Sequence, residues 1–562
     1  MNIRTLIPTI VAATFLLLPS CESYLEEEMI SNVAADTYYS TPAGFQDAVK
    51  ATYSFTKPFY GVERGYSMTV FGTDTYTNGS DGSHKGLNLY DGQLNPTNGL
   101  ISGTWRDNYR GINQANAVID RSVELQGVTE EEKTARLAEV RFLRALYYFD
   151  LVRFFGDVHL TLEETQGVEI EANRTPASEI YVQAIVPDLE FALANLPDVQ
   201  SDYGRATRPA AQFLLGKVLL TRSYTSYAEG DDASRAESLF TSVIDNPLFS
   251  LLDNYADLWD IDNERNSEVV WAIQNSKTQV DEGLDSEGNR GHLYFLMEYD
   301  NQPGLTRDVE NGRPWKRFRP TEFTLQLWDR SVDTRYDGSF KSVWYANNAG
   351  TIPKYTAEEA AAGYGTKDQP KFELGDTAIY IPGPQLENEW PQSRQAATRY
   401  QVITSDEYTE RLYPTLSKWL DPTRPNRQHM QGQRDYVLMR LGDAYLLRAE
   451  ARLQQNDVEG ATEDINVIRT RGAVEGQEEA NQISADQVDL NFLLDERGRE
   501  LVGEGHRWFD LVRTMTLIER VRAHNPQGAP NIEPFHRLRP IPQDQIDRTL
   551  GGYEQNEGYL GG

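Results

Sequence analysis

Pairs of amphipathic helices recur along this sequence, and their recurrence constrains the fold more than any other feature. Spacings of four and three residues place these side chains on one face of a first helix: Trp105, Tyr109, Ile112, Asn116 and Ile119. Further helices are predicted at about 130–155, 178–196, 208–224, 234–245, 438–453 and 458–468. Because consecutive helices form hairpins, the sequence predicts a mostly α-helical scaffold of tetratricopeptide-like repeats, although it contains no full repeat consensus.

Two long segments interrupt the helical pattern, at about residues 60–103 and 246–430. They contain scattered aromatic residues with Pro, Gly, Asn and Asp, and a few short strand-like runs such as 268–274. The helical scaffold is therefore predicted at about 105–245 and 433–562, within a body that covers residues 36–562. Since long ordered loops often carry binding residues, the two segments are predicted to form a loop-rich ligand-binding face.

The first twenty residues have the composition of a secretory signal peptide. Arg4 precedes an apolar stretch at 6–18 that is too short to span a bilayer. The run Leu18-Pro19-Ser20-Cys21 resembles the lipobox of bacterial lipoproteins, which implies that Cys21, the only cysteine, becomes the lipidated N-terminus. Residues 21–35 then form an acidic tether. An ordinary signal peptide with a coincidental cysteine is the alternative interpretation.

The net charge of −31 limits the partners of this chain. Nucleic acid and anionic lipid surfaces would both repel it, so neither is expected to bind. Most of the 54 basic residues are arginine. A composition rich in Asp and Glu and poor in Lys would suit a salty habitat, where salt screens the negative surface. Codon usage of the lineage is the other explanation, and both stay open.

Five blocks of sequence occur in a fixed order. They are Trp105, Tyr109, Ile112 and Asn116 in a W-x3-Y-x2-I-x3-N pattern; the stretch 139–157; the stretch 440–451 with 465–472; Glu496, Arg497, Glu500, Glu504, Arg507 and Trp508; and 538–542 with 555–559. Together they resemble the SusD/RagB family, the surface lipoproteins of Bacteroidetes nutrient-uptake systems. His159 stands where this family usually has proline, a departure that affects only one turn.

This resemblance implies both a fold and a function. The fold is a SusD-like helical scaffold of tetratricopeptide-like hairpins with loop-rich insertions. The function is that of a cell-surface glycan-binding lipoprotein, anchored by lipid in the outer membrane and facing the exterior, which captures oligosaccharides and delivers them to a SusC-like TonB-dependent transporter. A peptide-capturing, RagB-like lid of such a transporter is the alternative. An enzyme and a purely structural partner of the transporter are further hypotheses.

Charged residues within the family blocks are predicted to have structural roles. Glu496 with Glu500, and Arg497 with Arg507, recur at helical spacing and would form ion-pair networks beneath the loops.

The sequence contains no catalytic motif. An H-E-x-x-H pair, a G-x-S-x-G elbow and a P-loop are all absent, and the single cysteine leaves no thiolate metal site. Pairs of carboxylates that could hydrolyse a glycosidic bond are too abundant in this sequence to be informative. With no catalytic motif and with the family resemblance, we expect neither enzymatic activity nor a cofactor. A structural calcium ion held by Asn78, Asp81 and nearby carbonyl groups is the one exception that the spacing allows.

A glycan site combines flat aromatic rings, which pack on the C–H faces of sugars, with Asp, Asn, Gln or Arg side chains that bind hydroxyl groups. The loop segments contain these predicted ligand-binding residues: Asp74, Tyr76, Asn78, Asp81, Tyr90, Tyr299, Arg313 and Trp315. His84, Tyr294 and Trp344 are further candidates. Core packing is the competing interpretation of each aromatic residue, and Tyr76 ranks above Arg313 and Trp315, which lie in a framework-like stretch.

Overall fold

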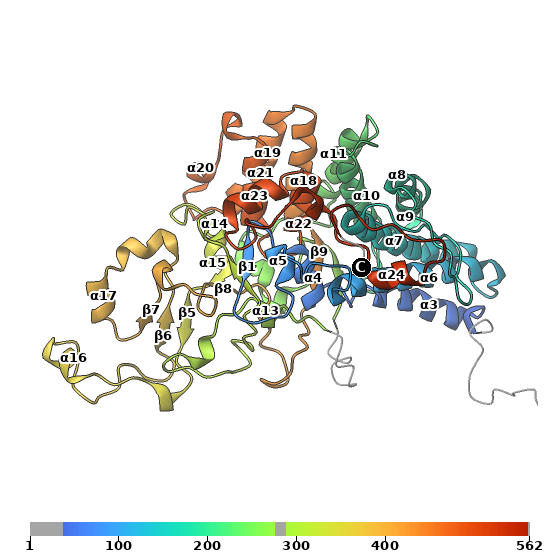
Figure 1. The fold of residues 1–562 in the computed structure, drawn as a ribbon. Helices are drawn as coiled ribbons and strands as arrows, with labels where there is room; N and C mark the ends of the chain where they lie inside the picture. The colour runs from blue at the N-terminus through green and yellow to red at the C-terminus, as the bar shows by residue number, and fades with distance from the viewer. Residues whose placement is uncertain (1–37, 276–287, 560–562) are drawn as a thin grey trace, which may run out of the picture.

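The computed structural model describes residues 38–275 and 288–559 (Figure 1). The predictions for the signal peptide at 1–20, for lipidation at Cys21 and for the tether at 21–35 lie outside these residues. Within them, no helix combines the length and the apolar composition needed to cross a membrane.

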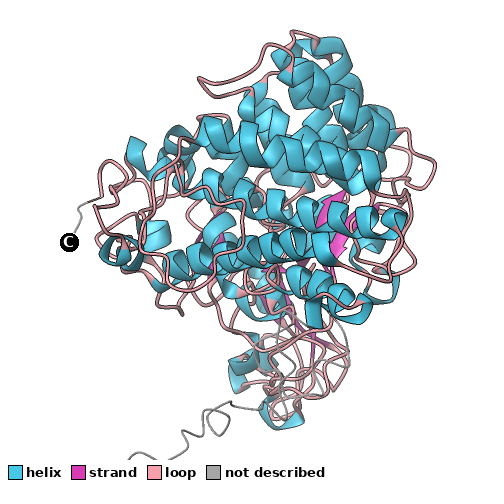
Figure 2. Cartoon of the chain, turned by 90° about the vertical axis from the view of Figure 1, so that its right-hand side faces the viewer, coloured by secondary structure: helices cyan, strands magenta, loops and turns pink. Residues whose placement is uncertain are grey.

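The scaffold is a chain of packed helices. In order they are α3 (Pro42–Ser54), α6 (Gly99–Arg121), α7 (Glu130–Phe155), α9 (Val186–Asn195), α10 (Arg208–Arg222), α11 (Asp232–Ile244), α18 (Leu441–Gln454), α19 (Val458–Arg471) and α21 (Leu490–Glu500). Each helix from α6 to α11 packs on the next, and α11 packs on α18 across the long insertion. The prediction of a mostly α-helical, hairpin-based fold is confirmed, and Figure 2 shows these helices side by side as one body.

Helix boundaries follow local capping chemistry. Helix α7 begins where the Thr129 hydroxyl accepts a hydrogen bond from the Glu132 N–H at 3.2 Å, and it ends at Gly156, whose φ of 74° suits glycine. These bounds confirm the predicted helix at 130–155. Thr207 caps α10 in the same way through the Ala210 N–H.

The predicted helix at 178–196 is divided into three parts. It starts as α8 (Ala177–Ile180), continues as a π-helical turn, η4 (Tyr181–Ile185), and ends as α9. Pro187 lies in the first turn of α9 and has no N–H to donate to the preceding turn. A wider π turn accommodates this missing hydrogen bond without ending the helix.

Short strands connect distant parts of the chain. Strand β2 (Val269–Ile273) confirms the strand predicted at 268–274 and pairs antiparallel with β9 (Tyr436–Arg440). The prediction that Leu438 belongs to a helix is wrong, because β9 supplies the hydrogen-bond partners that β2 needs and α18 begins only at Leu441.

The other strands all lie in the two loop-rich segments. They are β1 (Tyr76–Asn78) paired with β3 (Phe318–Pro320), β4 (Phe340–Lys341) paired with β8 (Thr415–Leu416), and the sheet of β5 (Val343–Tyr345), β6 (Thr377–Tyr380) and β7 (Gln401–Val402). Short helices accompany them: α4 (Glu63–Thr69), α5 (Gly86–Leu89), α13 (Gly291–Tyr294), α14 (Glu322–Leu325), α15 (Arg335–Ser339), α16 (Ala357–Ala361) and α17 (Gln392–Ala397). After α21 the chain forms α22 (Arg507–Arg513), α23 (Leu517–His524) and α24 (Gln543–Arg548).

Among the described residues there is one main hydrophobic core and several smaller ones, of which the largest lies in the insertion. The main core joins the scaffold helices to α4, α13 and β3. The core of the insertion lies beside β5–β7 and includes Tyr299, Trp344 and Ile379. In Figure 1 the insertion with α16, α17 and β5–β7 forms a lobe at the lower left of the scaffold.

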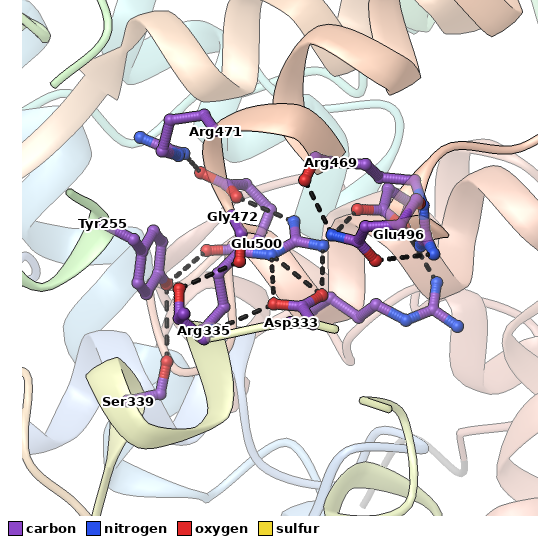
Figure 3. Close-up of polar contacts among 12 residues, drawn as sticks. Tyr255, Asp333, Arg335, Ser339, Arg469, Arg471, Gly472, Glu496 and Glu500 are labelled. Atoms are coloured by element: carbon purple, nitrogen blue, oxygen red, sulfur yellow. Dashed lines mark hydrogen bonds and ion pairs between the residues drawn. The ribbon is translucent and has the colours of Figure 1, made fainter. Parts of the chain in front are cut away.

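A buried ion-pair network lies where the insertion meets the scaffold (Figure 3). The Glu500 carboxylate accepts hydrogen bonds from Arg440 at 2.7 Å and Arg335 at 3.0 Å, and it also binds Arg471. Glu496 binds Arg335 at 2.7 Å. The predicted ion-pair role of Glu496 and Glu500 is confirmed.

The other predicted pair of basic residues joins similar contacts. Arg497 binds Asp443 at 2.8 Å and Asp510 at 2.9 Å, and both acids are buried. Arg507 binds Asp74 of the first loop segment at 2.6 Å. The arginines of the family blocks therefore hold loops and helices together from inside the protein.

Candidate functional site

The two loop-rich segments meet along the β1–β3 ribbon. Beyond the ribbon, the Gly79 N–H donates to the Arg317 carbonyl at 2.9 Å, and the Asp81 N–H donates to the Lys316 carbonyl at 3.2 Å. A side chain at position 79 would place its Cβ 2.1 Å from the Lys316 carbonyl oxygen, so this close approach requires glycine. The backbone thus fixes both segments into one surface.

Trp315 is the aromatic residue of this surface that reaches solvent. Its side chain is half-buried, and its ring packs edge-on against the buried Tyr294 with 5.8 Å between centroids. The guanidinium carbons of Arg317 and Arg313 lie 5.0 Å and 5.9 Å from the ring centroid. Two backbone hydrogen bonds, from Trp315 to the Leu293 carbonyl at 2.8 Å and from Arg317 to the Tyr294 carbonyl at 2.9 Å, hold the segment against α13.

Charged side chains surround the Trp315 ring. Arg317 binds Glu63 at 2.9 Å, and the exposed Asp81 lies 3.3 Å from the Lys316 ammonium. Burial lowers the pKa of the nearby half-buried His84, with Glu63 acting against this shift and Arg317 adding to it. The surface therefore offers an aromatic ring together with hydrogen-bond donors and acceptors. We call it the Trp315 surface; it comprises Glu63, Asp81, His84, Arg313, Trp315, Lys316 and Arg317.

Four of the sequence-predicted candidates lie on or beside this surface: Asp81, His84, Arg313 and Trp315. Their exposure reverses the predicted ranking, since Arg313 and Trp315 reach solvent and Tyr76 does not. Three members were not predicted, namely Glu63, Lys316 and Arg317. The run Arg313-Pro-Trp-Lys-Arg317, in which basic residues flank a tryptophan, was the available sequence signal for two of them.

Asp74 has a structural position. Its side chain has no exposed surface and accepts hydrogen bonds from Arg507 at 2.6 and 2.7 Å and from Arg520 at 2.7 Å. Burial opposes ionisation, but the two arginines outweigh it and lower the pKa of Asp74 to about 2. The carboxylate ties the first loop segment to α22 and α23, and in this conformation it has no access to a ligand.

Tyr76 and Asn78 are buried in β1. The Tyr76 ring is fully buried and packs edge-on against Phe295 at 5.3 Å, and its hydroxyl has no hydrogen-bond partner among the described residues. Asn78 is 3% exposed. As core residues, both contribute to the packing beneath the Trp315 surface.

The unpaired hydroxyl of Tyr76 gives a testable consequence. A buried hydroxyl without a partner opposes folding, so Tyr76→Phe is expected to leave the free energy of unfolding unchanged or to raise it by about 1 kcal/mol. Urea denaturation of both proteins would measure the difference. Tyr90→Phe is the matched control, because its hydroxyl donates to the Gly72 carbonyl at 2.6 Å and its loss should destabilise. Destabilisation of Tyr76→Phe to the same extent would contradict this assignment.

The remaining predicted aromatic residues are also buried. Tyr90 is 3% exposed, and burial raises the pKa of its hydroxyl to about 12. Tyr299 has no exposed surface, stacks on the equally buried Trp344 at 4.6 Å and donates to the Gly312 carbonyl at 2.6 Å. Through this hydrogen bond to Gly312, the buried Tyr299 holds the backbone next to Arg313 in place.

Only one of the two residues considered for a calcium ion, Asp81, reaches solvent. Asp81 lies beside the Lys316 ammonium at 3.3 Å, which places a positive charge where the ion would sit, and the Asn78 side chain is buried. Elsewhere in the described chain, Glu229, Asp231 and Asp232 lie together, but Asp232 binds Arg222 at 2.6 Å.

A hollow of about 670 Å³ lies between α3 and β2 and includes Tyr53 and Trp271 in its lining. The polar groups of both residues are occupied, since the Tyr53 hydroxyl donates to Glu139 at 2.6 Å and the Trp271 indole donates to the Gly204 carbonyl at 2.9 Å. The indole N–H of Trp315 makes no hydrogen bond within the described residues. We therefore favour the Trp315 surface as the candidate site.

The fold and this surface define a class of protein: a tetratricopeptide-like helical scaffold whose inserted loops form one aromatic and charged face. The SusD family model matches residues 253–559, more than half of the chain, and a second model described as starch-binding associating with outer membrane matches residues 23–220. The chain belongs to the SusD family.

Individual relatives agree with this assignment. SusD-like protein P25 of Formosa agariphila is 26% identical, over 97% of this chain and 99% of the relative. The starch-binding protein SusD of Bacteroides thetaiotaomicron is 25% identical, over 80% of this chain and 76% of the relative. Among solved structures, a laminarin-binding SusD-like protein superposes with a TM-score of 0.67 at 23% identity, covering 92% of this chain and 100% of that chain. A SusD homolog from Bacteroides thetaiotaomicron gives a TM-score of 0.70 at 21% identity, covering 95% and 100%.

Proposed function

We propose that this chain is a cell-surface glycan-binding lipoprotein that captures oligosaccharides and delivers them to a partner TonB-dependent outer-membrane transporter. The observation that carries the proposal is the Trp315 surface, where a half-exposed indole is flanked by arginines and a carboxylate. The names of relatives support it, since two of them are described as binding starch and laminarin. Lipid on Cys21 would hold the protein at the outer membrane, facing the exterior.

The proposed chemistry needs binding and no catalysis. The exposed part of the Trp315 ring would pack on the C–H face of one sugar. Asp81 would accept hydrogen bonds from sugar hydroxyls, and the guanidinium groups of Arg313 and Arg317 would donate them. The energy for transport would come from the partner transporter. This chain would bind the glycan and cover the opening of the transporter like a lid.

Trp315→Ala is expected to weaken glycan binding by about ten-fold, because an exposed aromatic ring at the centre of a site contributes a large share of the affinity. The chain without residues 1–21 would first be screened against diverse glycans and peptides. Calorimetry with the tightest glycan would then compare wild type and variant.

Tyr345→Ala is the matched control, since Tyr345 is 56% exposed, lies on β5 and is not a member of the Trp315 surface. It should bind like wild type, and both variants should keep the melting temperature within a few degrees. Equal affinity of Trp315→Ala and wild type would remove this surface from the site. Binding of peptides and of no glycan would favour the alternative, a peptide-capturing lid.

A further inference from the structure

A second hollow lies directly beside the Trp315 surface. It has a volume of about 360 Å³ and is lined by Asp300, Asn301, Thr306, Arg307, Arg313, Arg427 and Gln428. Arg313 belongs to both places, since its guanidinium carbon lies 5.9 Å from the Trp315 ring centroid. A ligand on the Trp315 ring would therefore be next to this hollow, which we call the arginine hollow.

The arginine hollow carries unbalanced positive charge. Arg307 is neutralised by Asp300 through hydrogen bonds of 2.7 and 3.0 Å. Arg313 and Arg427 have no carboxylate partner within the described residues. The chain as a whole has a net charge of −31. The two arginines without a carboxylate partner therefore make the hollow a local region of positive charge on a negatively charged protein.

Buried contacts hold the loop that carries Arg427 in place. Arg424 is 3% exposed and donates to the Val309 carbonyl and to the His429 carbonyl, both at 2.8 Å. The Asp421 carboxylate accepts from the Gln433 N–H at 2.6 Å and so closes the same loop. Because Val309 lies between Arg307 and Arg313 in the chain, these bonds bring the loop against the segment that bears the other two arginines.

We propose that the arginine hollow binds an anionic substituent, a carboxylate or a sulfate ester, on a sugar adjacent to the one that packs on Trp315. This inference rests on the proposed glycan-binding function and specifies the class of glycan. Guanidinium groups match the two or three oxygens of such anions through paired hydrogen bonds. Asn301, Thr306 and Gln428 add neutral groups that suit the neighbouring hydroxyls.

Affinity electrophoresis tests the proposal with defined polymers. Gels would contain polygalacturonate, alginate or κ-carrageenan, and parallel gels would contain the carboxyl-reduced or desulfated forms of the same polymers. The acidic protein is repelled by polyanions in general, so retardation by an acidic polymer reports a specific site. Wild type should bind at least one acidic polymer about ten-fold more tightly than its neutralised form. The polymer that is retained distinguishes a carboxylate ligand from a sulfate ligand.

Two variants test the hollow. Arg427→Gln should remove most of the preference for the acidic polymer and leave binding to the neutral form unchanged. Adding Arg313→Gln should remove the rest of the preference and also weaken binding to the neutral form, because Arg313 belongs to the Trp315 surface as well. Arg399→Gln is the control, because Arg399 is exposed on another part of the insertion and has no ion pair within the described chain. It should retain the full preference.

The outcomes separate this inference from the proposed function. If no acidic polymer retards wild type, or if the double variant keeps its preference, the anion site is wrong. Neutral glycans that still bind through Trp315 would leave the proposed function intact in that case. Failure of every glycan, acidic or neutral, would overturn both.

Discussion

Replacing Glu500 by glutamine is expected to lower the free energy of unfolding by about 3–5 kcal/mol. The Glu500 side chain is fully buried and contacts Arg335, Arg440 and Arg471. Burial alone would raise its pKa, but the three arginines outweigh burial and hold the pKa well below its usual range. Glutamine keeps the shape and removes the charge, so three guanidinium groups lose much of their compensation away from water.

Urea denaturation would measure this loss as a lower midpoint with an unchanged slope. Asp544→Asn is the control, since the Asp544 and Arg548 side chains lie 3.6 Å apart and are 73% and 80% exposed. Screening by water makes such a pair worth less than about 1 kcal/mol. If both variants lost equally little stability, the network around Glu500 would be open to solvent and our description of it would be wrong.

The network also explains why arginine predominates over lysine among the buried basic residues. Arg335 comes from the insertion, Arg440 from β9 and Arg471 from α19, and all three converge on one carboxylate. A planar guanidinium with five N–H donors can serve several acceptors from one position, which an ammonium group does less well. The insertion is thereby fixed to the scaffold on which its loops depend.

Much of the scaffold could be predicted because its helices are long and strongly periodic. The helix at 130–155 has clear signals at both ends, a capping threonine and a terminating glycine, and its predicted bounds agree with the structure. The π turn before Pro187 and the strand at 436–440 could not be predicted in the same way. The strand depends on pairing with the distant β2, and the π turn lies inside an otherwise helical pattern, so helical periodicity reports neither.

The candidate site could be predicted only in part, because residue type does not determine exposure. Tyr76 and Trp315 both lie in polar, loop-like stretches, yet β1 turns Tyr76 into the core and the segment after α13 leaves Trp315 at the surface. In the sequence alone, Asp74 looks like a ligand-binding carboxylate. The structure shows that it is paired with Arg507, which is far away in the chain. Arg427 joins Arg313 only through tertiary structure, so no local pattern identifies the pair.

The acid sensitivity of the fold should depend measurably on His506. This side chain is 4% exposed, and its Nδ1 lies 3.2 Å from the Lys217 ammonium, which also lies 3.3 Å from Asp443. Burial, with Lys217 beside it, lowers the pKa of His506 to about 4. The neutral ring accepts a hydrogen bond from Lys217, and a protonated ring would repel it.

The direction of the pH effect follows from this shift. An unfolded histidine takes up a proton near pH 6.5, whereas folded His506 does so only near pH 4. As the pH falls between these values the unfolded state binds more protons, so stability that is fully present above pH 6.5 is lost, by roughly 3 kcal/mol in total. Asp74, Glu496 and Asp510, whose pKa values are lowered to about 2, lose their contributions mainly below this window.

His506→Asn separates the histidine from the other titrating groups. Asparagine can still accept a hydrogen bond from Lys217 but does not titrate, so the variant should lose about 2.5 kcal/mol less stability than wild type between pH 7.5 and pH 4.5. Burial raises the pKa of Glu264 to about 8, and this group acts in the opposite direction in the same window, but equally in both proteins. Urea denaturation at half-unit pH steps gives the difference directly. Parallel curves for the two proteins would show that folded His506 takes up its proton at the same pH as an unfolded histidine, and the lowered pKa would then be wrong.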